Sequence, residues 1–443
     1  MTGGCNSMDS QPNILWILTT QWRAMATGYA GDVNARTPWL DGLASEAVNF
    51  TQAVTPHPLG PQARAALLTG RLCPENGVKG YWDALPVYEE EKRSAGAERA
   101  PSSGAPTGRT VAHALKDRGY STAWFGKWHL SERDRTAPFV GEAHAKQFVP
   151  PERRGGFEMW EGFESGFLLN DPWLHGTRLP QPTHFKGYQA DVLAGRAGAW
   201  CQGQRAKGEA GGRPYFCVVS LEAPHPPYHA PAPNAAEVRP GEIQLRANVP
   251  VAAAEQAREE LAGYYAHIEA TDRAIGRLLS DVDLTSTIVV FTSVHGDMHG
   301  AHGLFRKGWP YEESVRVPLL IRKGPGAKCK EAGKYDDCAV SLVDLPHMAV
   351  AWAEGREWHA KGDSALISMP TADIPHQCPV AWRGFRSAKH KLVLKQEPSP
   401  STSSGQTETV WMYFDLERDP LEMKNLAEDP ARAGEIQELM KLI

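Results

Sequence analysis

The chain has 443 residues, of which 42% are hydrophobic and 22% are charged. This composition is typical of a soluble globular protein, and a chain of this length can bury a large core. Its net charge of −5 excludes a basic field that would attract nucleic acid, and no run of about 18 apolar residues is present to span a membrane. Neither nucleic acid nor a membrane is therefore expected as a partner.

The cysteines indicate free thiols. There are seven, an odd number, widely spaced and without a Cys-x-x-Cys pair: Cys5, Cys73, Cys201, Cys217, Cys329, Cys338 and Cys378. This pattern argues against a disulfide framework or a structural zinc site, and it suits a reducing compartment. No apolar run precedes Ile14, so no secretory signal is visible, and we expect a cytoplasmic protein whose residues 1–12 are disordered.

Short apolar runs alternate with amphipathic segments through most of the chain. The run at 13–18 (NILWIL) predicts a strand buried on both faces. Further elements follow in chain order: a helix from 37 to 47, a strand at 48–51, helices at 64–69 and 111–118, strands at 121–125 and 215–221, a long helix at 255–279, and strands at 287–292 and 317–322. Gly70 and Gly119 mark the ends of two of the helices.

This alternation predicts an α/β fold with a mostly parallel central sheet flanked by helices, over residues 13–372. After about residue 375 the pattern changes: 382–394 and 410–416 read as strands and 431–443 as a closing helix. We expect residues 373–443 to form a small C-terminal α+β subdomain with an antiparallel sheet. Ligands of parallel α/β sheets bind beyond the carboxyl ends of the strands.

Seven segments, in order, resemble signatures of the sulfatase family of the alkaline-phosphatase superfamily. They are NILWILTTQWR (13–23), RAALLTG (64–70), FGKWHL (125–130), APHPPY (223–228), YYAHIEATDRAIGRLL (264–279), FTSVHGDMHGAHGLFRKGWPYEESVRVP (291–318) and YFDLERDPLEMKNLAEDP (413–430). The resemblance implies the alkaline-phosphatase-like fold and a sulfuric ester hydrolase, in which a cysteine or serine converted to formylglycine attacks sulfur beside a calcium ion.

At the position that the resemblance assigns to the nucleophile, counted back from Arg64, the chain has Gly60. No cysteine, serine or threonine lies between residues 57 and 66. Glycine has no side chain with which to attack a sulfate ester, so the family's usual reaction is not expected at this position.

The resemblance also places the calcium ligands, and two aspartate positions are changed. Thr20 and Val294 stand where the family has aspartates, whereas Gln21 and His295 are kept. Calcium prefers carboxylate and carbonyl oxygens. Calcium, expected for the family, should therefore bind weakly or not at all, and Asp297 is not expected to replace a lost ligand.

Five cationic or titratable side chains of the family pattern are retained: Arg64, Lys127, His129, His225 and Lys307. They predict a cationic pocket with little negative charge. These residues either only maintain the inherited fold or form a site that binds an anion. Trp160, Trp173 and Trp309 are either core residues or the lining of a sugar-binding cleft.

Two functions remain open from the sequence. One is a sulfatase-family pseudoenzyme that binds a sulfated or other anionic small molecule or glycan. The other is an active sulfuric or phosphoric ester hydrolase with a non-standard nucleophile such as Thr20. The sequence gives no indication of the oligomeric state.

Overall fold

The computed structural model describes residues 11–88, 108–208, 212–324, 333–358, 362–374, 377–398 and 406–443. Residues 1–10 of the N-terminal segment expected to be disordered lie outside the described residues.

A ten-stranded sheet forms the centre of the described structure, in the order β10-β2-β9-β8-β1-β7-β3-β4-β5-β6. Its five middle strands, β8-β1-β7-β3-β4, are parallel, and the neighbouring pairs β8–β9 and β4–β5 are antiparallel. The strands are β1 (Asn13–Thr19), β2 (Val48–Phe50), β3 (Ser121–Lys127), β4 (Met159–Phe163), β5 (Trp173–Gly176), β6 (Thr183–His184), β7 (Tyr215–Ser220), β8 (Thr287–Ser293), β9 (Leu319–Arg322) and β10 (Tyr335–Asp336).

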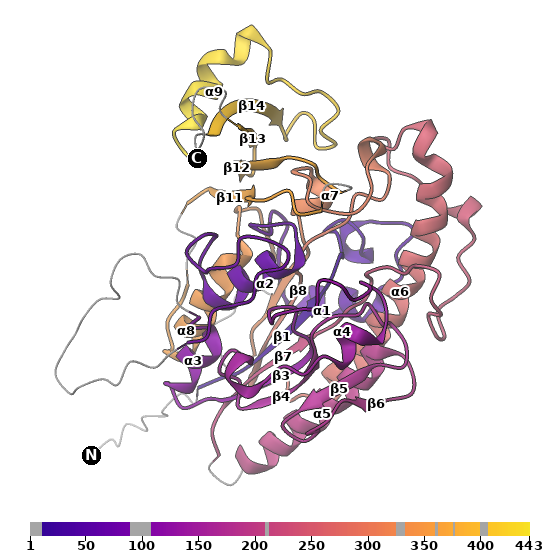
Figure 1. Cartoon of the computed structure of the whole chain (residues 1–443), viewed down its shortest axis with the longest axis vertical. Coiled ribbons are helices and arrows are strands. Elements are labelled where there is room, and N and C mark those ends of the chain that lie inside the picture. Colours follow the sequence, from indigo (N-terminus) through magenta and orange to yellow (C-terminus); the bar gives the residue numbers. More distant parts are fainter. Residues whose placement is uncertain are drawn as a thin grey trace, which may run out of the picture.

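Helices cover both faces of this sheet (Figure 1). The alternating side chains of β1 show why its apolar run is continuous, since Leu15 and Ile17 enter one core and Trp16 and Leu18 the other. On the first face lie α1 (Pro38–Glu46), α5 (Gln189–Gly208) and α6 (Ala254–Ser280), and on the second lie α2 (Gly60–Thr69), α3 (Val111–Lys116) and α8 (Leu345–Ala353). The predicted mostly parallel, helix-covered sheet is confirmed.

A second, antiparallel sheet lies at the far end of the molecule with the last helix, α9 (Ala433–Met440), as Figure 1 shows. Its strands are β11 (Ser364–Met369), β12 (Ala381–Ser387), β13 (His390–Pro398) and β14 (Gln406–Asp415). β11 precedes residue 373, where the change in sequence pattern suggested that a subdomain begins. Two short helices, α4 (Glu142–Lys146) and α7 (Glu312–Val315), lie in the connections.

The segment 382–394, predicted as one strand, is a hairpin. The hydroxyl of Ser387 accepts hydrogen bonds from the backbone N–H groups of Lys389 and His390, and this turn separates β12 from β13. Serine closes turns in this way through its side chain, and the apolar spacing on either side concealed the break.

The parallel strands end at one edge of the sheet. β1 leads directly into Thr20, β3 ends at Lys127, β7 is followed by Glu222, and β8 leads into Val294. Residues far apart in sequence are thereby brought together at this edge. Among the described residues, no helix is both long and apolar enough to cross a membrane.

Candidate functional site

A cavity of about 280 Å³ opens at this edge of the sheet. It is lined by Thr20, Leu59, Gly60, Tyr81, Lys127, His129, Phe139, Val140, Phe167, His225, Pro226, Pro227, His295, Arg306, Lys307, Ile374 and Gln377. Six of the eight predicted site residues that carry a polar side chain line it: Thr20, Lys127, His129, His225, His295 and Lys307. The aromatic and apolar residues form much of the remaining wall.

Gly60 is the first residue of α2, and the imidazole of His129 fills the space beside it. A β-carbon at Gly60 would lie 2.8 Å from Nδ1 of His129, closer than real contacts allow. His129 has a left-handed backbone (φ 60°), and its two ring nitrogens are buried without a hydrogen-bond partner among the described residues. Burial, reinforced by the charge of Arg133, holds the pKa of His129 well below its usual value, so the ring is neutral.

The Arg64 guanidinium lies beneath the cavity floor and is almost fully buried. It donates to the Thr20 hydroxyl (3.0 Å), the Ser220 hydroxyl (2.6 Å) and the Lys127 carbonyl (3.2 Å). Thr20 in turn donates its hydroxyl proton to the Leu221 carbonyl (3.0 Å). Arg64 therefore ties the ends of β1, β3 and β7 together, and the Thr20 hydroxyl bonds a carbonyl rather than a base.

Lys127 forms a buried ion pair with Glu222, with 2.7 Å between Nζ and Oε1. Burial lowers the pKa of Lys127 to about 8, and the charge of Glu222 limits the shift. Glu222 was not identified from the sequence, although a charged residue directly after a buried strand was an available signal. No acidic side chain is among the described lining residues, but the pairing of Glu222 with Lys127 was not anticipated.

Lys307 occupies the centre of the polar wall. Its ammonium donates to the Gln21 amide oxygen and to Nε2 of His225, which lies 3.0 Å away. Nδ1 of His225 faces the Pro226 carbonyl at 2.7 Å, so His225 donates there and accepts from Lys307. The ring of His225 also stacks on Phe167, with centroids 4.4 Å apart. Burial lowers the pKa of Lys307 to about 7.

Asp297 completes this network from behind Gln21. Its carboxylate accepts from the Gln21 amide and, at 2.6 Å, from the Tyr228 hydroxyl. Burial alone would raise its pKa, but the opposing charges of His299 and Arg306 bring it to about 2. A second carboxylate is thus present near the cavity, bonded to the protein's own donors.

The residues at the expected calcium positions do not fit a calcium ion. Val294 is apolar, the Thr20 oxygen contacts Arg64, and the Gln21 oxygen accepts from the Lys307 ammonium. His295 offers a nitrogen and directs Nδ1 at the Gly296 carbonyl. Calcium takes about six to eight oxygen ligands. Few oxygen atoms remain at these positions, and the Lys307 ammonium already contacts one of them, the Gln21 amide oxygen.

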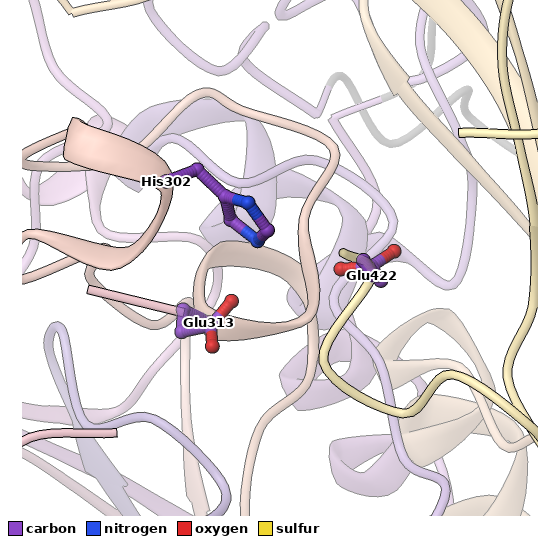
Figure 2. Close-up of side chains that lie close together, drawn as sticks. All are labelled: His302, Glu313 and Glu422. Carbon is purple, nitrogen blue, oxygen red and sulfur yellow. The ribbon is translucent and has the colours of Figure 1, made fainter. Parts of the chain in front are cut away.

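Another group of residues has the spacing of a metal site, away from this cavity. Figure 2 shows His302, Glu313 and Glu422, whose ligand atoms lie within 4.8 Å of one another. Lys391 already binds Glu422 at 2.6 Å, and Arg246 and Asn248 contact Glu313. The carboxylates are thus already neutralised by protein donors, so the contacts describe an ion-pair network.

The three singled-out tryptophans have different environments. Trp160 is fully buried in the core, and Trp173 lies near the surface, donating to Glu142. Trp309 lines a separate hollow next to the cavity.

The described sheet and the cavity at the carboxyl ends of its strands match the alkaline-phosphatase-like fold expected from the sequence. The sulfatase family profile matches residues 12–355, and the chain therefore belongs to the sulfatase family. It is 33% identical over 438 residues to an ulvan-active sulfatase of Formosa agariphila, covering 95% of this chain and 78% of that protein.

Two solved structures have the same fold. A Bacteroides fragilis protein named YidJ aligns with a TM-score of 0.77 at 24% identity, covering 98% of this chain and 94% of that one. A structure in complex with its substrate, D-glucosamine-2-N,6-O-disulfate, aligns with a TM-score of 0.73 at 20% identity, covering 98% and 97%.

Proposed function

We propose that this protein binds a sulfated ligand in the cavity and does not hydrolyse it. The observation that carries this proposal is the environment of Gly60, where the ring of His129 stands in the space that a nucleophilic side chain would need. The alternative nucleophile is Thr20. Its hydroxyl donates a hydrogen bond to the Leu221 carbonyl, and no base is among its described contacts. Loss of a nucleophile removes several kcal/mol of transition-state stabilisation.

The retained cations support anion binding without a metal. An ammonium carries three N–H donors, and the described contacts of Lys307 use two of them. The third donor is available to a ligand oxygen in the cavity. In a buried site, such a charge-assisted hydrogen bond is about twice as strong as a neutral one.

The start of α2 adds a weaker contribution. Leu59 and Gly60 line the cavity, and Leu59, as the residue that precedes the helix, offers no side-chain acceptor to its first turn. The positive end of the helix dipole therefore faces the cavity, which favours an anion. A sulfate monoester supplies the charge and acceptor oxygens that Lys307, His129 and this helix end would recognise. Of the relatives named above, one is an ulvan-active sulfatase and one has a disulfated glucosamine as its substrate.

Binding and hydrolysis are tested separately. Sulfate and phosphate are titrated calorimetrically in EDTA, and hydrolysis of an aryl sulfate and an aryl phosphate is measured with calcium, magnesium and manganese. We expect sulfate to bind in EDTA, Lys307→Met to weaken it at least about tenfold, and no ester to turn over. Lys389→Met, at a largely exposed lysine distant in the fold, is the control and should bind sulfate normally.

Metal-dependent turnover by the unaltered protein would overturn the proposal. So would sulfate binding that survives the double change Lys127→Ala and His129→Ala, since both residues line the cavity.

A further inference from the structure

A second hollow adjoins the cavity. It has a volume of about 320 Å³ and is lined by Gly303, Leu304, Phe305, Arg306, Trp309 and Gln377. Two of these residues, Arg306 and Gln377, also line the first cavity. The two hollows are therefore neighbours, with Arg306 and Gln377 between them.

One short segment supplies residues to both hollows. Lys307 lines the first and Trp309 the second, with Gly308 between them in a left-handed conformation (φ 90°). The carbonyl of Gly308 accepts a hydrogen bond from the indole of Trp382 at 2.8 Å, which anchors this turn on the small sheet. The anion-binding lysine and the indole are thus held in a fixed relation.

Two buried polar atoms of this hollow lack partners. The indole Nε1 of Trp309 and the amide Oε1 of Gln377 have no hydrogen-bond partner among the described residues. One is a donor and the other an acceptor, and burial of either group without a partner is unfavourable. Sugar hydroxyls both donate and accept, and the C–H faces of a sugar ring pack on aromatic rings such as Trp309 and Phe305.

The charge of the hollow argues against a second sulfate there. Arg306 is the only cation in its described lining, and its guanidinium donates to both carboxylate oxygens of Glu260, at 2.5 and 3.1 Å. It also lies over the Tyr228 ring. Arg306 is therefore already neutralised, and the hollow suits an uncharged group.

We propose that the hollow at Trp309 and Gln377 binds an uncharged sugar unit next to the sulfated unit held by Lys307. The ligand is then a sulfated oligosaccharide rather than a small sulfate ester. This inference rests on the proposed function and adds to it the class of ligand.

The test compares ligand lengths by calorimetry in EDTA. The probes are glucose 6-sulfate and disaccharides in which the same sulfated unit carries one uncharged hexose at either end. We expect at least one disaccharide to bind about tenfold more tightly than the monosaccharide. Trp309→Ala should abolish this gain and leave the affinity for glucose 6-sulfate unchanged, whereas Trp173→Ala, at the surface tryptophan, should keep the gain.

Two further variants guard against a folding defect. Trp309→Phe keeps an aromatic ring and removes the indole donor, and Gln377→Ala removes the acceptor; each should lose part of the gain. A gain that is absent, or that persists in all three variants of the hollow, overturns the inference while leaving the anion site intact. If neither the monosaccharide nor the disaccharides bind, the proposed function fails as well.

Discussion

A β-carbon added at Gly60 meets Nδ1 of His129 at 2.8 Å, so the ring must move to admit it. We expect Gly60→Ala to lower the free energy of unfolding by about 1 kcal/mol, because crowding in a close-packed site outweighs the helix preference of alanine. Gly195→Ala in α5 is the matched control, since that glycine is helical with nothing within 4 Å, and it should stabilise by about 1 kcal/mol. Urea unfolding of both variants measures the difference; equal stabilisation of both would contradict the crowding at His129.

His57 joins the segment before α2 to strand β11. Its Nε2 accepts from the Cys73 N–H at 3.2 Å and its Nδ1 faces the Ser368 carbonyl at 3.1 Å, so the neutral ring is required. Burial lowers its pKa to about 4, below the usual 6.5. The stability it contributes is therefore present above pH 6.5 and is lost as the pH falls toward 4.

The corresponding prediction concerns the pH dependence of unfolding. Between pH 7 and pH 5, His57 should account for a loss of about 2 kcal/mol. In His57→Gln, whose side chain does not titrate, urea midpoints at the two pH values should differ by correspondingly less than in the unaltered protein. An unchanged difference would show that His57 titrates normally in the folded state.

The sequence indicated which side chains meet at the cavity but not how they are bonded. Lys127, His129, His225 and Lys307 were found because each lies in a recognisable motif after a strand. The Glu222 partner of Lys127 and the contact of Lys307 with Gln21 depend on distances between strands that a motif does not specify.

At the scale of elements, α1 receives its cap from another helix. Thr37, which precedes α1, provides no side-chain cap, and Asp272 of α6 instead accepts from the backbone N–H groups of Trp39 and Leu40. Asp272→Ala leaves both donors without their acceptor and should cost about 2 kcal/mol of unfolding free energy. Asp272→Asn, which keeps one acceptor oxygen, should cost less; hydrogen exchange at residues 39 and 40 provides a local check.

Helices with a clear apolar repeat and strands with a continuous apolar run were predicted from the sequence, whereas a helix without such a repeat was missed. The 27 residues of α6 show a clear apolar stripe and the run at β1 is continuous, so both were identified to within a residue or so. Helix α5 was missed because glycines at 195, 198 and 203 interrupt a weakly amphipathic sequence, and tertiary packing against α6 decides its conformation.

At the scale of the whole molecule, a buried ion network joins the small sheet to α7, which lies between β8 and β9 of the large sheet in the sequence. Glu312 of α7 binds Arg386 of β12 at 2.8 Å, and Lys391 of β13 binds both Glu312 (2.8 Å) and Glu422 (2.6 Å). Lys391 is fully buried, so its removal leaves two carboxylates short of a cation. Breaking one partner from a buried charge network costs about 3–5 kcal/mol.

Lys391→Met should therefore lower the unfolding free energy by about that amount, whereas Lys395→Met, on the same strand and partly exposed, should change it little. Adding Glu422→Gln to Lys391→Met should recover part of the loss, because the uncompensated carboxylate is then gone. Urea unfolding of the unaltered protein, Lys391→Met, Glu422→Gln and the double variant forms the required double-mutant cycle. A double variant no more stable than Lys391→Met would mean that Glu422 is neutral in the folded protein.

The Arg64–Thr20 hydrogen bond bears on whether hydrolysis can return by mutation. A carboxylate introduced at position 20 would lie within bonding distance of the Arg64 guanidinium. It would form an ion pair with Arg64 in preference to binding a metal ion. Gln21 likewise holds the Lys307 ammonium, and His129 stands against Gly60. Under the proposed function, the neighbouring residues prevent hydrolysis as much as the replaced residues do. The triple change Thr20→Asp, Gly60→Cys and Val294→Asp would restore the residue types of the family motif, but it would not restore the family's metal site.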